Sequence, residues 1–366
     1  MINVFSPDIT EDDISSVLKT LNEKSISGTS EVVNQFENKF KNLIGRNYCT
    51  SVSNGSVALD LALQSLDLKK GDEIILPSFT IISCLSSILR TEATPIFCDV
   101  DLDSWNMTLE DVKKRITKKT KAVIMVHTYG LTAEADEIEK LCKKNGIFLI
   151  EDASEAHGQK YKDKYCGNFG TISTFSFYAN KHITTGEGGA LLTNSLKYEK
   201  IFKRMRNLDF QSNKRFVHNE AYWNQRLGGL QAALGISQIK NLKKTIKLKT
   251  LQGEIYNELL EDFKDQIKIP LKENLGVKNH YWVYGIVIKK NISQKKIMEG
   301  LKKEGIETRP FFWALHEQPV YLKNFTRKFE NKNSEYIARK GLYLPLGIHL
   351  DSKKQEFIVN KLLKII

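Results

Sequence analysis

Clustered cysteines and prolines are missing from this sequence. The five cysteines are scattered without a C-x-x-C pair, which argues against a disulfide framework or a zinc site and favours reduced, structural thiols. The seven prolines and 22 glycines form no repeat or low-complexity tract. With 41% hydrophobic residues, the chain is therefore neither collagen-like nor mainly disordered.

Long apolar runs are missing as well. Apolar runs such as those at 122–126 and 147–150 are far too short to span a bilayer. The first residues show no basic segment followed by an apolar stretch, so no signal peptide is expected. These absences predict a soluble, cytoplasmic protein with no membrane partner.

Positive charge is what the sequence has in excess. The chain has 366 residues with 55 Lys+Arg against 43 Asp+Glu, a formal net charge of +12, which raises the hypothesis of nucleic-acid binding. The lysines are spread over predicted helix surfaces, and the densest run, 240–249, is amphipathic. Nucleic-acid sites need a basic stripe, usually with aromatic platforms or a docking motif, so solvated helix faces are favoured and no nucleic-acid partner is expected.

Short apolar runs alternate with amphipathic stretches over the first two-thirds of the chain. Strands are predicted at 72–76, 95–100, 121–126 and 146–150, and helices lie between them, for example at 56–66 and 132–144. This alternation is typical of an α/β fold whose parallel sheet is covered by helices on both faces.

The last third of the chain has a different pattern, which predicts a smaller α+β domain. An apolar helix is expected at 230–239, then a long connecting helix around 242–263. A strand at 281–288 and helices at 294–303 and near 334–343 follow. We therefore expect a large domain at 1–240 and a connecting helix with a small domain at 241–366. The first residues of the chain are candidates to join the small domain.

Two motifs lie where predicted strands turn into helices, which is where open α/β sheets bind ligands. Ser-Asn-Gly-Ser at 53–56 precedes a helix, so it either binds a phosphate at the helix N-terminus or only caps the helix. Glu-Asp at 151–152 ends an apolar strand and is followed by His157. At least one carboxylate should reach the crevice, although an N-cap by Asp152 and a packed His157 are equally ordinary outcomes.

Two further motifs contain a lysine and a polar aromatic loop. Lys181 lies in Thr-Phe-Ser-Phe-Tyr-Ala-Asn-Lys at 174–181, away from any charge run. It is either a sheltered amine that forms Schiff bases or a solvated loop residue. Tyr-Trp-Asn-Gln-Arg at 222–226 either lines a polar pocket or packs on its own helix. Together, a phosphate-binding helix start, a strand-end carboxylate and a sheltered lysine are the set that a pyridoxal phosphate enzyme needs.

The sequence resembles the DegT/DnrJ/EryC1/StrS family of sugar aminotransferases, a branch of the fold-type I pyridoxal phosphate enzymes. The resemblance covers nearly the whole chain in order. It rests on motifs at 53–56, 71–80, 127–130, 151–158, 176–181, 184–189, 230–235 and 307–310. Within the family it is most similar to the branch that makes GDP-perosamine, because of the segment around Lys181 and Glu-Thr-Arg-Pro-Phe-Phe at 307–312 with His316 and Pro319 following.

The resemblance implies the following roles at matching positions. Lys181 would form the Schiff base (internal aldimine) with pyridoxal 5'-phosphate and then move the proton, and Asp152 would keep the ring nitrogen protonated. The remaining implied cofactor contacts are Gly55, Ser56 and Ser176 at the phosphate, Glu155 and Ile81 beside the ring, and Asn224. The implied substrate-binding residues are Tyr178, Glu187, Arg309 and His316, and no metal is implied.

The resemblance also implies the reaction and the assembly. Glutamate would donate the amino group to a nucleotide-linked 4-keto-6-deoxy sugar, with GDP-4-keto-6-deoxymannose giving GDP-perosamine for surface polysaccharide biosynthesis. Asn224 would reach the site of a second subunit, so a homodimer with shared active sites is expected. Some relatives carry His at the Schiff-base position and act as sugar 3-dehydratases. The spacing from 184–189 places Lys181, not His182, at that position, so an aminotransferase is expected.

Two departures from the family pattern affect these expectations. Ile81 stands where the family usually has an aromatic residue stacked on the cofactor ring, so stacking is weaker or comes from elsewhere. Leu-Gly-Gly at 227–229 replaces the common Met-Thr-Asn. These departures keep an alternative open: another nucleotide-linked keto sugar, or a small phosphorylated ketone such as dihydroxyacetone phosphate.

Overall fold

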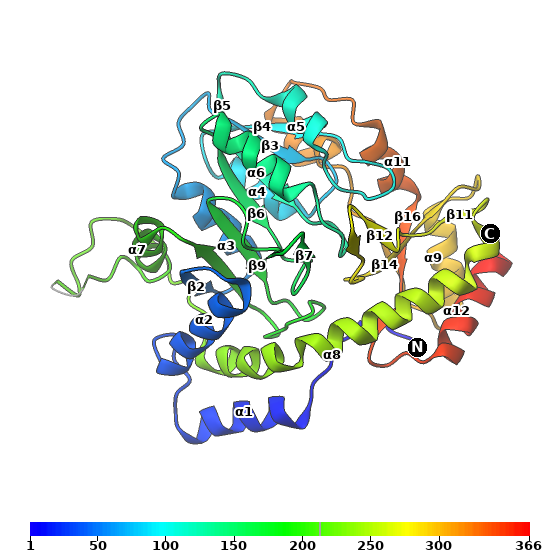
Figure 1. Cartoon of the computed structure of the whole chain (residues 1–366), viewed down its shortest axis with the longest axis horizontal. Helices are drawn as coiled ribbons and strands as arrows, with labels where there is room; N and C mark the ends of the chain where they lie inside the picture. Colours follow the sequence, from blue (N-terminus) through cyan, green and yellow to red (C-terminus); the bar gives the residue numbers. More distant parts are fainter. Residues whose placement is uncertain (212–213) are drawn as a thin grey trace.

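A seven-stranded sheet forms the centre of the large domain in the computed structural model, which describes residues 1–211 and 214–366 (Figure 1). All strands run parallel except β10, which is antiparallel to both neighbours. From one edge to the other the strands are β2 (Tyr48–Val52), β10 (Gly189–Thr193), β9 (Ile172–Ser176), β6 (Phe148–Asp152), β5 (Thr120–Val126), β3 (Glu73–Pro77) and β4 (Thr94–Cys98). The predicted α/β fold with a mainly parallel sheet is confirmed.

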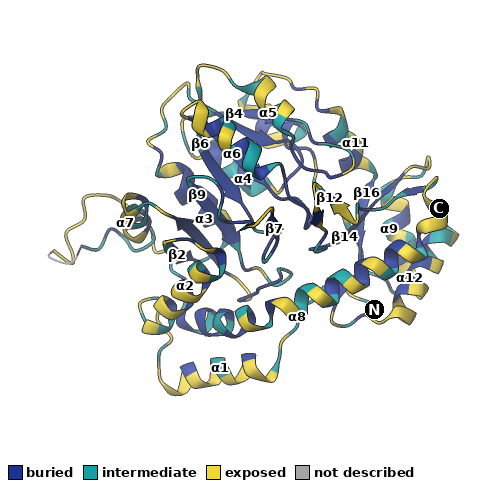
Figure 2. Cartoon of the chain, viewed as in Figure 1, coloured by how far each residue is buried: buried dark blue, intermediate teal, exposed yellow. Residues whose placement is uncertain are grey.

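Helices cover this sheet, and their inward sides are buried while their outward sides are exposed (Figure 2). One apolar core lies between the sheet and helices α3 to α7. A second lies where α2 and the first half of α8 pack against β9 and β10. These helices are α2 (Glu31–Ile44), α3 (Gly55–Gln64), α4 (Ile82–Leu89), α5 (Leu109–Arg115), α6 (Ala135–Lys144), α7 (Leu196–Met205) and α8 (Gly229–Leu259). All five cysteines are buried and free, as expected for structural thiols.

A single helix, α8, joins the two domains. It has 31 residues, so the prediction of separate helices at 230–239 and 242–263 was wrong. No glycine or proline interrupts 236–252, so nothing ends the hydrogen-bonded ladder between the two segments. The expected boundary at residue 240 falls inside this helix. Its lysines leave it too polar for a bilayer, and no helix among the described residues is both long and apolar enough to cross one.

The small domain is built on an antiparallel sheet whose strand order is β11 (Ile267–Lys268), β14 (Tyr284–Ile288), β16 (Gly341–Leu344) and β15 (Arg309–Pro310). The other elements after α8 are η1 (Glu261–Phe263), the hairpin β12 (Glu273–Asn274) and β13 (Val277–Lys278), α9 (Gln294–Lys303), η2 (Leu315–Glu317), α10 (Pro319–Asn324), α11 (Lys332–Lys340), β17 (Leu346–Gly347) and α12 (Ser352–Ile365). Helix α9 has the predicted bounds. The helix predicted near 334–343 ends earlier, because Gly341 begins β16.

The start of the chain is tied to this small domain. Strand β1 (Phe5–Ser6) pairs in parallel with β17, and Ile2 pairs with Ile306. Helix α1 (Glu11–Asn22) then packs along α8 and leads into the large domain. Both chain termini lie at the small-domain end of the molecule (Figure 1).

The strand predicted at 281–288 starts later than expected. Tyr281 has φ of 46°, a left-handed conformation that cannot continue a strand, and β14 begins at Tyr284. The amide of Tyr281 donates to the side-chain oxygen of Asn279 at 2.7 Å, which stabilises this bend. The bend directs Trp282 towards the large domain, where the candidate site lies.

Candidate active site

A cavity of about 540 Å³ lies between the carboxyl ends of the parallel strands and the small domain. We call its large-domain wall the floor: Asn54, Gly55, Ser56, Leu59, Thr80, Ile81, Ser83, Val126, Asp152, Ser154, Glu155, Ser176, Tyr178, Asn180, Lys181 and Glu187. We call its small-domain wall the roof: Trp282, Arg309, Phe312 and Tyr343. The ends of β5, β6 and β9 and the segment after β3 contribute to the floor, as expected for an open α/β sheet.

Hydroxyl groups gather where α3 begins. The Oγ atoms of Ser56 and Ser83 lie 2.7 Å apart, and these residues stand in the first turns of α3 and α4. Ser176 follows from the end of β9, and a Cβ at Gly55 would come within 2.7 Å of its Cβ. Because Gly55 has no side chain, the helix start packs against Ser176 and brings the hydroxyls and the free N–H groups together. Asn54 also caps the helix by accepting from Val57 N at 2.9 Å, so capping and anion binding are compatible here.

The adjacent acids Glu151 and Asp152 point to opposite sides of the sheet. Asp152 lines the cavity and is 2% exposed. Its carboxylate accepts from Ser154 N at 3.1 Å and from the Cys84 thiol at 3.7 Å. No helix follows it, so the N-cap alternative was wrong. The turn made by its hydrogen bond to Ser154 fixes the carboxylate towards the cavity.

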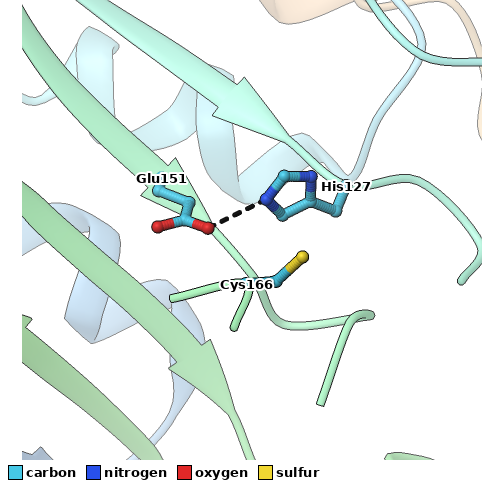
Figure 3. A group of neighbouring side chains, drawn as sticks. All are labelled: His127, Glu151 and Cys166. Carbon is cyan, nitrogen blue, oxygen red and sulfur yellow. Dashed lines mark hydrogen bonds and ion pairs between the residues drawn. The ribbon is translucent and has the colours of Figure 1, made fainter. Parts of the chain in front are cut away.

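Glu151 belongs to a buried network behind the site (Figure 3). It accepts from Gly167 N and Phe169 N at 2.5 and 2.8 Å, and its Oε1 lies 2.9 Å from Nε2 of His127. Cys166 completes a set of groups with metal-ligand chemistry. However, His127 Nδ1 already accepts from Ala133 N, and burial raises the pKa of the Cys166 thiol well above its ordinary value. His127 and Glu151 use their lone pairs in these hydrogen bonds and the Cys166 thiol keeps its proton, so we assign the set to fold stability.

Lys181 lies in the loop after β9 and its side chain is 9% exposed. Its Nζ is 3.7 Å from Glu155 Oε1 and 3.6 Å from the centre of the Trp282 ring. Burial lowers the pKa of the Lys181 ammonium below its ordinary value, although Glu155 and Asp152 oppose this change. Burial likewise raises the pKa of Glu155 to about 7, against the effect of Lys181. Both pKa shifts favour an uncharged amine beside an uncharged acid. A nucleophilic lysine requires the uncharged amine.

His157 does not reach the cavity. Its ring is fully buried and stacked on Phe175 and Phe177, with ring centres 5.4 and 5.7 Å away. Burial lowers the pKa of His157 to about 3, so the ring remains neutral. His157 is therefore a packed core residue, which is one of the two alternatives that the sequence left open.

The predicted substrate-binding residues divide into two groups. Tyr178, Glu187 and Arg309 line the cavity, and the Arg309 guanidinium lies 5.2 Å from the centre of the Phe5 ring. His316 is 5% exposed and lies outside the cavity lining. Its ring nitrogens face Ser78 Oγ at 2.6 Å and Glu335 Oε1 at 3.2 Å. His316 therefore links the segment after β3 to α11 and lies apart from this cavity lining, and its substrate-binding role stays a prediction.

Asn224 also lies apart from the cavity of its own chain. It is exposed, it forms an isolated bridge with Asn207, and the adjacent Trp223 is 72% exposed. The nearby glycines have a packing role: Gly228 caps α8, and a Cβ on Gly229 would come within 2.0 Å of Ser25 O. This close contact explains why residue 229 is a glycine, and the explanation needs no ligand.

Sequence reasoning missed the roof residues Trp282, Phe312 and Tyr343, and the floor residues Ser83 and Asn180. Ser83 follows Thr80 and Ile81 at a helix start, so the strand-end rule could have found it. Trp282 was assigned to a strand, and only the bend at Tyr281 brings it beside Lys181. No local sequence signal marks that contact.

The groups around the cavity fit pyridoxal phosphate. Serine hydroxyls and a helix N-terminus suit a phosphate, Asp152 suits a protonated ring nitrogen, and Lys181 suits an aldehyde carbon. The side-chain oxygen of Asn180 is buried without a partner among the described residues, which leaves an acceptor free on the floor. Ile81 is 38% exposed at the edge of the floor and offers an aliphatic surface instead of an aromatic ring.

Comparison with known proteins gives a consistent result. Residues 7–363 match the DegT/DnrJ/EryC1/StrS aminotransferase family. GDP-perosamine synthase of Escherichia coli O157:H7 is 34% identical over 99% of this chain and 97% of its own length. The structure of Helicobacter pylori PseC, an aminotransferase involved in the biosynthesis of pseudoaminic acid, is 26% identical and matches with a TM-score of 0.93 over 100% of this chain and 98% of its own. The E. coli GDP-4-keto-6-deoxy-D-mannose-3-dehydratase with bound hydrated pyridoxal phosphate is 25% identical, with a TM-score of 0.90 over 99% of both chains.

Proposed function

The chain belongs to the DegT/DnrJ/EryC1/StrS aminotransferase family and is a pyridoxal phosphate-dependent aminotransferase, and from that premise we propose that it aminates a nucleotide-linked 4-keto-6-deoxy sugar. The proposed acceptor is GDP-4-keto-6-deoxymannose, the donor is glutamate and the product is GDP-perosamine, for use in surface polysaccharides. The supporting observation is the 34% identity, over nearly the full length of both chains, to a GDP-perosamine synthase.

The floor residues would hold the cofactor. The hydroxyls of Ser56, Ser83 and Ser176 and the first N–H groups of α3 would bind the phosphate, and Asp152 would accept from the ring nitrogen. When bound, the cofactor supplies an aldehyde that links covalently to the substrate amine. It also supplies a ring that withdraws electrons from the substrate carbon attached to the amine nitrogen. The hydrogen bonds from Ser154 and Cys84 keep the Asp152 carboxylate oriented towards the ring.

Lys181 would supply the reactive amine and carry the proton. Its Nζ would hold the cofactor covalently, and when free it would move a proton between the substrate carbon and the cofactor carbon that bears the aldehyde. This role requires an uncharged Nζ at neutral pH, and burial lowers the pKa of Lys181 in that direction. Glu155, 3.7 Å away, is close enough to exchange a proton with Nζ through a water molecule or a small shift.

The roof would bind the anionic part of each substrate. Arg309 is the one cationic side chain in the small-domain wall, and a guanidinium binds carboxylates and phosphates with paired hydrogen bonds. We propose that it binds glutamate in one half-reaction and the sugar nucleotide in the other. Tyr178 and Glu187 lie on the exposed side of the floor, where hydroxyls of a sugar ring would meet them.

We further propose that two chains share their active sites. Asn224 is exposed and distant from its own cavity lining, and the exposed Trp223 beside it suits a subunit contact. Asn224 would then bind the cofactor phosphate of the partner subunit. Mixing the inactive Lys181→Ala and Asn224→Ala variants should restore about a quarter of wild-type activity, because one site per mixed dimer is intact and about half of the dimers are mixed. Strictly monomeric protein, or no restoration after subunit exchange is demonstrated, would contradict shared sites.

An amination panel tests the substrate. Purified enzyme with cofactor and glutamate would be incubated with GDP-4-keto-6-deoxymannose, a dTDP-linked 4-keto sugar and dihydroxyacetone phosphate, and the aminated products followed by mass spectrometry. We expect the GDP-linked sugar to be turned over at least tenfold faster than the others. Preferential turnover of dihydroxyacetone phosphate would replace the proposal with the alternative that Ile81 suggested.

A labelling experiment tests the lysine. Borohydride reduction of the cofactor-loaded protein should fix the cofactor to Lys181, identified by peptide mass spectrometry, and Lys181→Ala should lose the visible absorbance of the covalently linked cofactor. A Lys247→Ala variant is the control, because it removes an exposed lysine of α8 that lies outside the cavity lining. Cofactor fixed to any lysine other than Lys181 would refute the assignment.

A further inference from the structure

Lys249 is a buried lysine on a helix whose other lysines are exposed. It is 7% exposed, whereas Lys243, Lys244 and Lys247, two to six residues earlier on α8, all face solvent. Burying an amine is unfavourable unless its hydrogen bonds are satisfied, so its contacts should explain its position.

The Lys249 amine binds two backbone carbonyls that flank the candidate catalytic lysine. Its Nζ lies 3.1 Å from Trp282 O and 3.5 Å from Asn180 O. Asn180 directly precedes Lys181, and the indole N–H of Trp282 donates to the same Asn180 carbonyl at 3.1 Å. The Trp282 ring in turn lies against Lys181 Nζ. One carbonyl, from Asn180, therefore joins Lys249, Trp282 and the Lys181 loop.

Lys249 stands where α8 passes from one domain to the other. Before it, Leu242 and Ile246 pack against Gly158 of the large domain. After it, Gln252 donates to Gly347 O and Leu350 O, and Gly253 lies against the Tyr281 ring of the small domain. Lys249 is thus the point at which the helix contacts the Lys181 loop and the roof at once.

The titratable groups whose charges interact with this amine are His157, His182 and Lys181, and His280 lies beside His182, with its carbonyl 3.2 Å from His182 Nε2. Burial lowers the pKa of His157, His182 and His280, so all three rings remain neutral near pH 7. Burial, and then the charge of Lys181, lower the pKa of Lys249 to about 7. Lys249 can therefore donate both hydrogen bonds without bringing a full charge into the site above neutral pH.

We propose that Lys249 is a positioning residue for Lys181: it fixes the Asn180 carbonyl and Trp282 so that the indole face covers the Lys181 amine. This inference rests on the proposed role of Lys181 and adds a second lysine, from the connecting helix, that acts through the backbone. It also means that the roof and the catalytic amine are held by the same side chain.

The central test compares Lys249→Met with Lys247→Met, an exposed lysine on the same helix. In Lys249→Met we expect kcat to fall about tenfold or more, because the Lys181 amine is displaced. We expect KM for glutamate to change less than threefold, because the substrate contacts remain. The apoprotein gives a readout independent of activity. Competitive acylation at a series of pH values, analysed by peptide mass spectrometry, should show the midpoint for Lys181 rising by about one pH unit in Lys249→Met, because the displaced Lys181 amine loses its cover by the indole and becomes better hydrated. Lys247→Met should match wild type in both.

Two further variants keep the test decisive if Lys249→Met folds poorly. Lys249→Arg retains hydrogen-bond donors for both carbonyls and should recover part of the kcat. Trp282→Phe keeps an aromatic ring but removes the indole donor to Asn180, and should lower kcat by a smaller factor with the same rise in the Lys181 midpoint. Unchanged Lys181 midpoints and kcat in folded Lys249→Met would overturn the proposal and leave Lys249 a packing residue. Retention of the linked-cofactor absorbance by Lys181→Ala would instead refute the proposed function, so the two failures are distinguishable.

Discussion

The floor and the roof of the cavity differ in how the chain builds them. The floor consists of short motifs at strand ends, so Asp152, Ser176 and Lys181 meet as soon as the sheet has its strand order. The roof depends on the bend at Tyr281 and on contacts across the domain junction. The difference teaches that local motifs build the wall proposed to hold the cofactor, whereas contacts across the domain junction build the wall proposed to bind the anionic part of each substrate.

The largest effect on kcat is expected from a substitution in the floor. The adjacent acids Glu151 and Asp152 provide a matched pair for this test. Asp152→Asn should lower kcat by about 10² to 10⁴, because an amide cannot hold a proton on the ring nitrogen, with little change in thermal stability. Glu151→Gln should lower the free energy of unfolding by about 2–4 kcal/mol, because it weakens a buried network, with near-normal kcat in folded protein. Steady-state kinetics and denaturant unfolding of both variants measure this. A catalytic loss in Glu151→Gln as large as that in Asp152→Asn would erase the distinction between the two acids.

A smaller and different effect is expected from the roof. Arg309→Met should raise KM for the sugar nucleotide about 10- to 100-fold, the loss expected for a charge-assisted hydrogen bond, with kcat reduced by less than fivefold. Kinetics with both substrates measure it, with Lys323→Met of α10, outside the cavity, as control. If Arg309→Met reduced kcat more than it raised KM, the roof would take part in chemistry and the comparison would need revision.

The pH dependence of the free energy of unfolding tests one floor residue, Glu155. Folding raises the pKa of Glu155 from 4.5 to about 7, so the folded apoprotein binds a proton that the unfolded chain releases. That stabilisation is fully present below pH about 4.5 and is lost as the pH rises towards 7. Across this range Glu155→Gln should gain stability relative to wild type, on the order of 2 kcal/mol. Urea unfolding of both apoproteins from pH 4.5 to 8 checks this, and a constant difference would show that Glu155 stays ionised.

The smallest effect concerns the edge of the floor. Ile81→Phe introduces an aromatic ring at the 38% exposed position beside the cavity. An aromatic contact contributes about 0.5–1.5 kcal/mol beyond burial, so the dissociation constant for pyridoxal phosphate should fall about three- to tenfold. Cofactor titration by fluorescence measures it, with Ile81→Leu as the size control. Weaker binding in Ile81→Phe would indicate that another group already occupies the ring face.

Local patterns made the sheet, α9 and the floor predictable. Apolar strands ending in polar residues define a strand-end site, and Lys181 and Asp152 were assigned from that rule and the family resemblance. The position of His316 outside the cavity lining was not predictable, because its partners Ser78 and Glu335 are far apart in the sequence and only packing brings them together. Helix α8 was divided in two because its middle carries lysines instead of an apolar stripe. Trp282 and Lys249 went unrecognised because their contacts with the Lys181 loop cross between domains.

The pairing of β1 with β17 has a consequence for the order in which the enzyme is made. Phe5 lies beside Leu346, so the first and last parts of the chain form one small sheet. During synthesis from the N-terminus, residues 48–193, which supply every strand of the large sheet, emerge well before β17. The floor can therefore assemble on the ribosome before β17 has been made and while β1 is still unpaired. The roof closes only after residues 282–347 have been made, so a covered active site requires synthesis past β17.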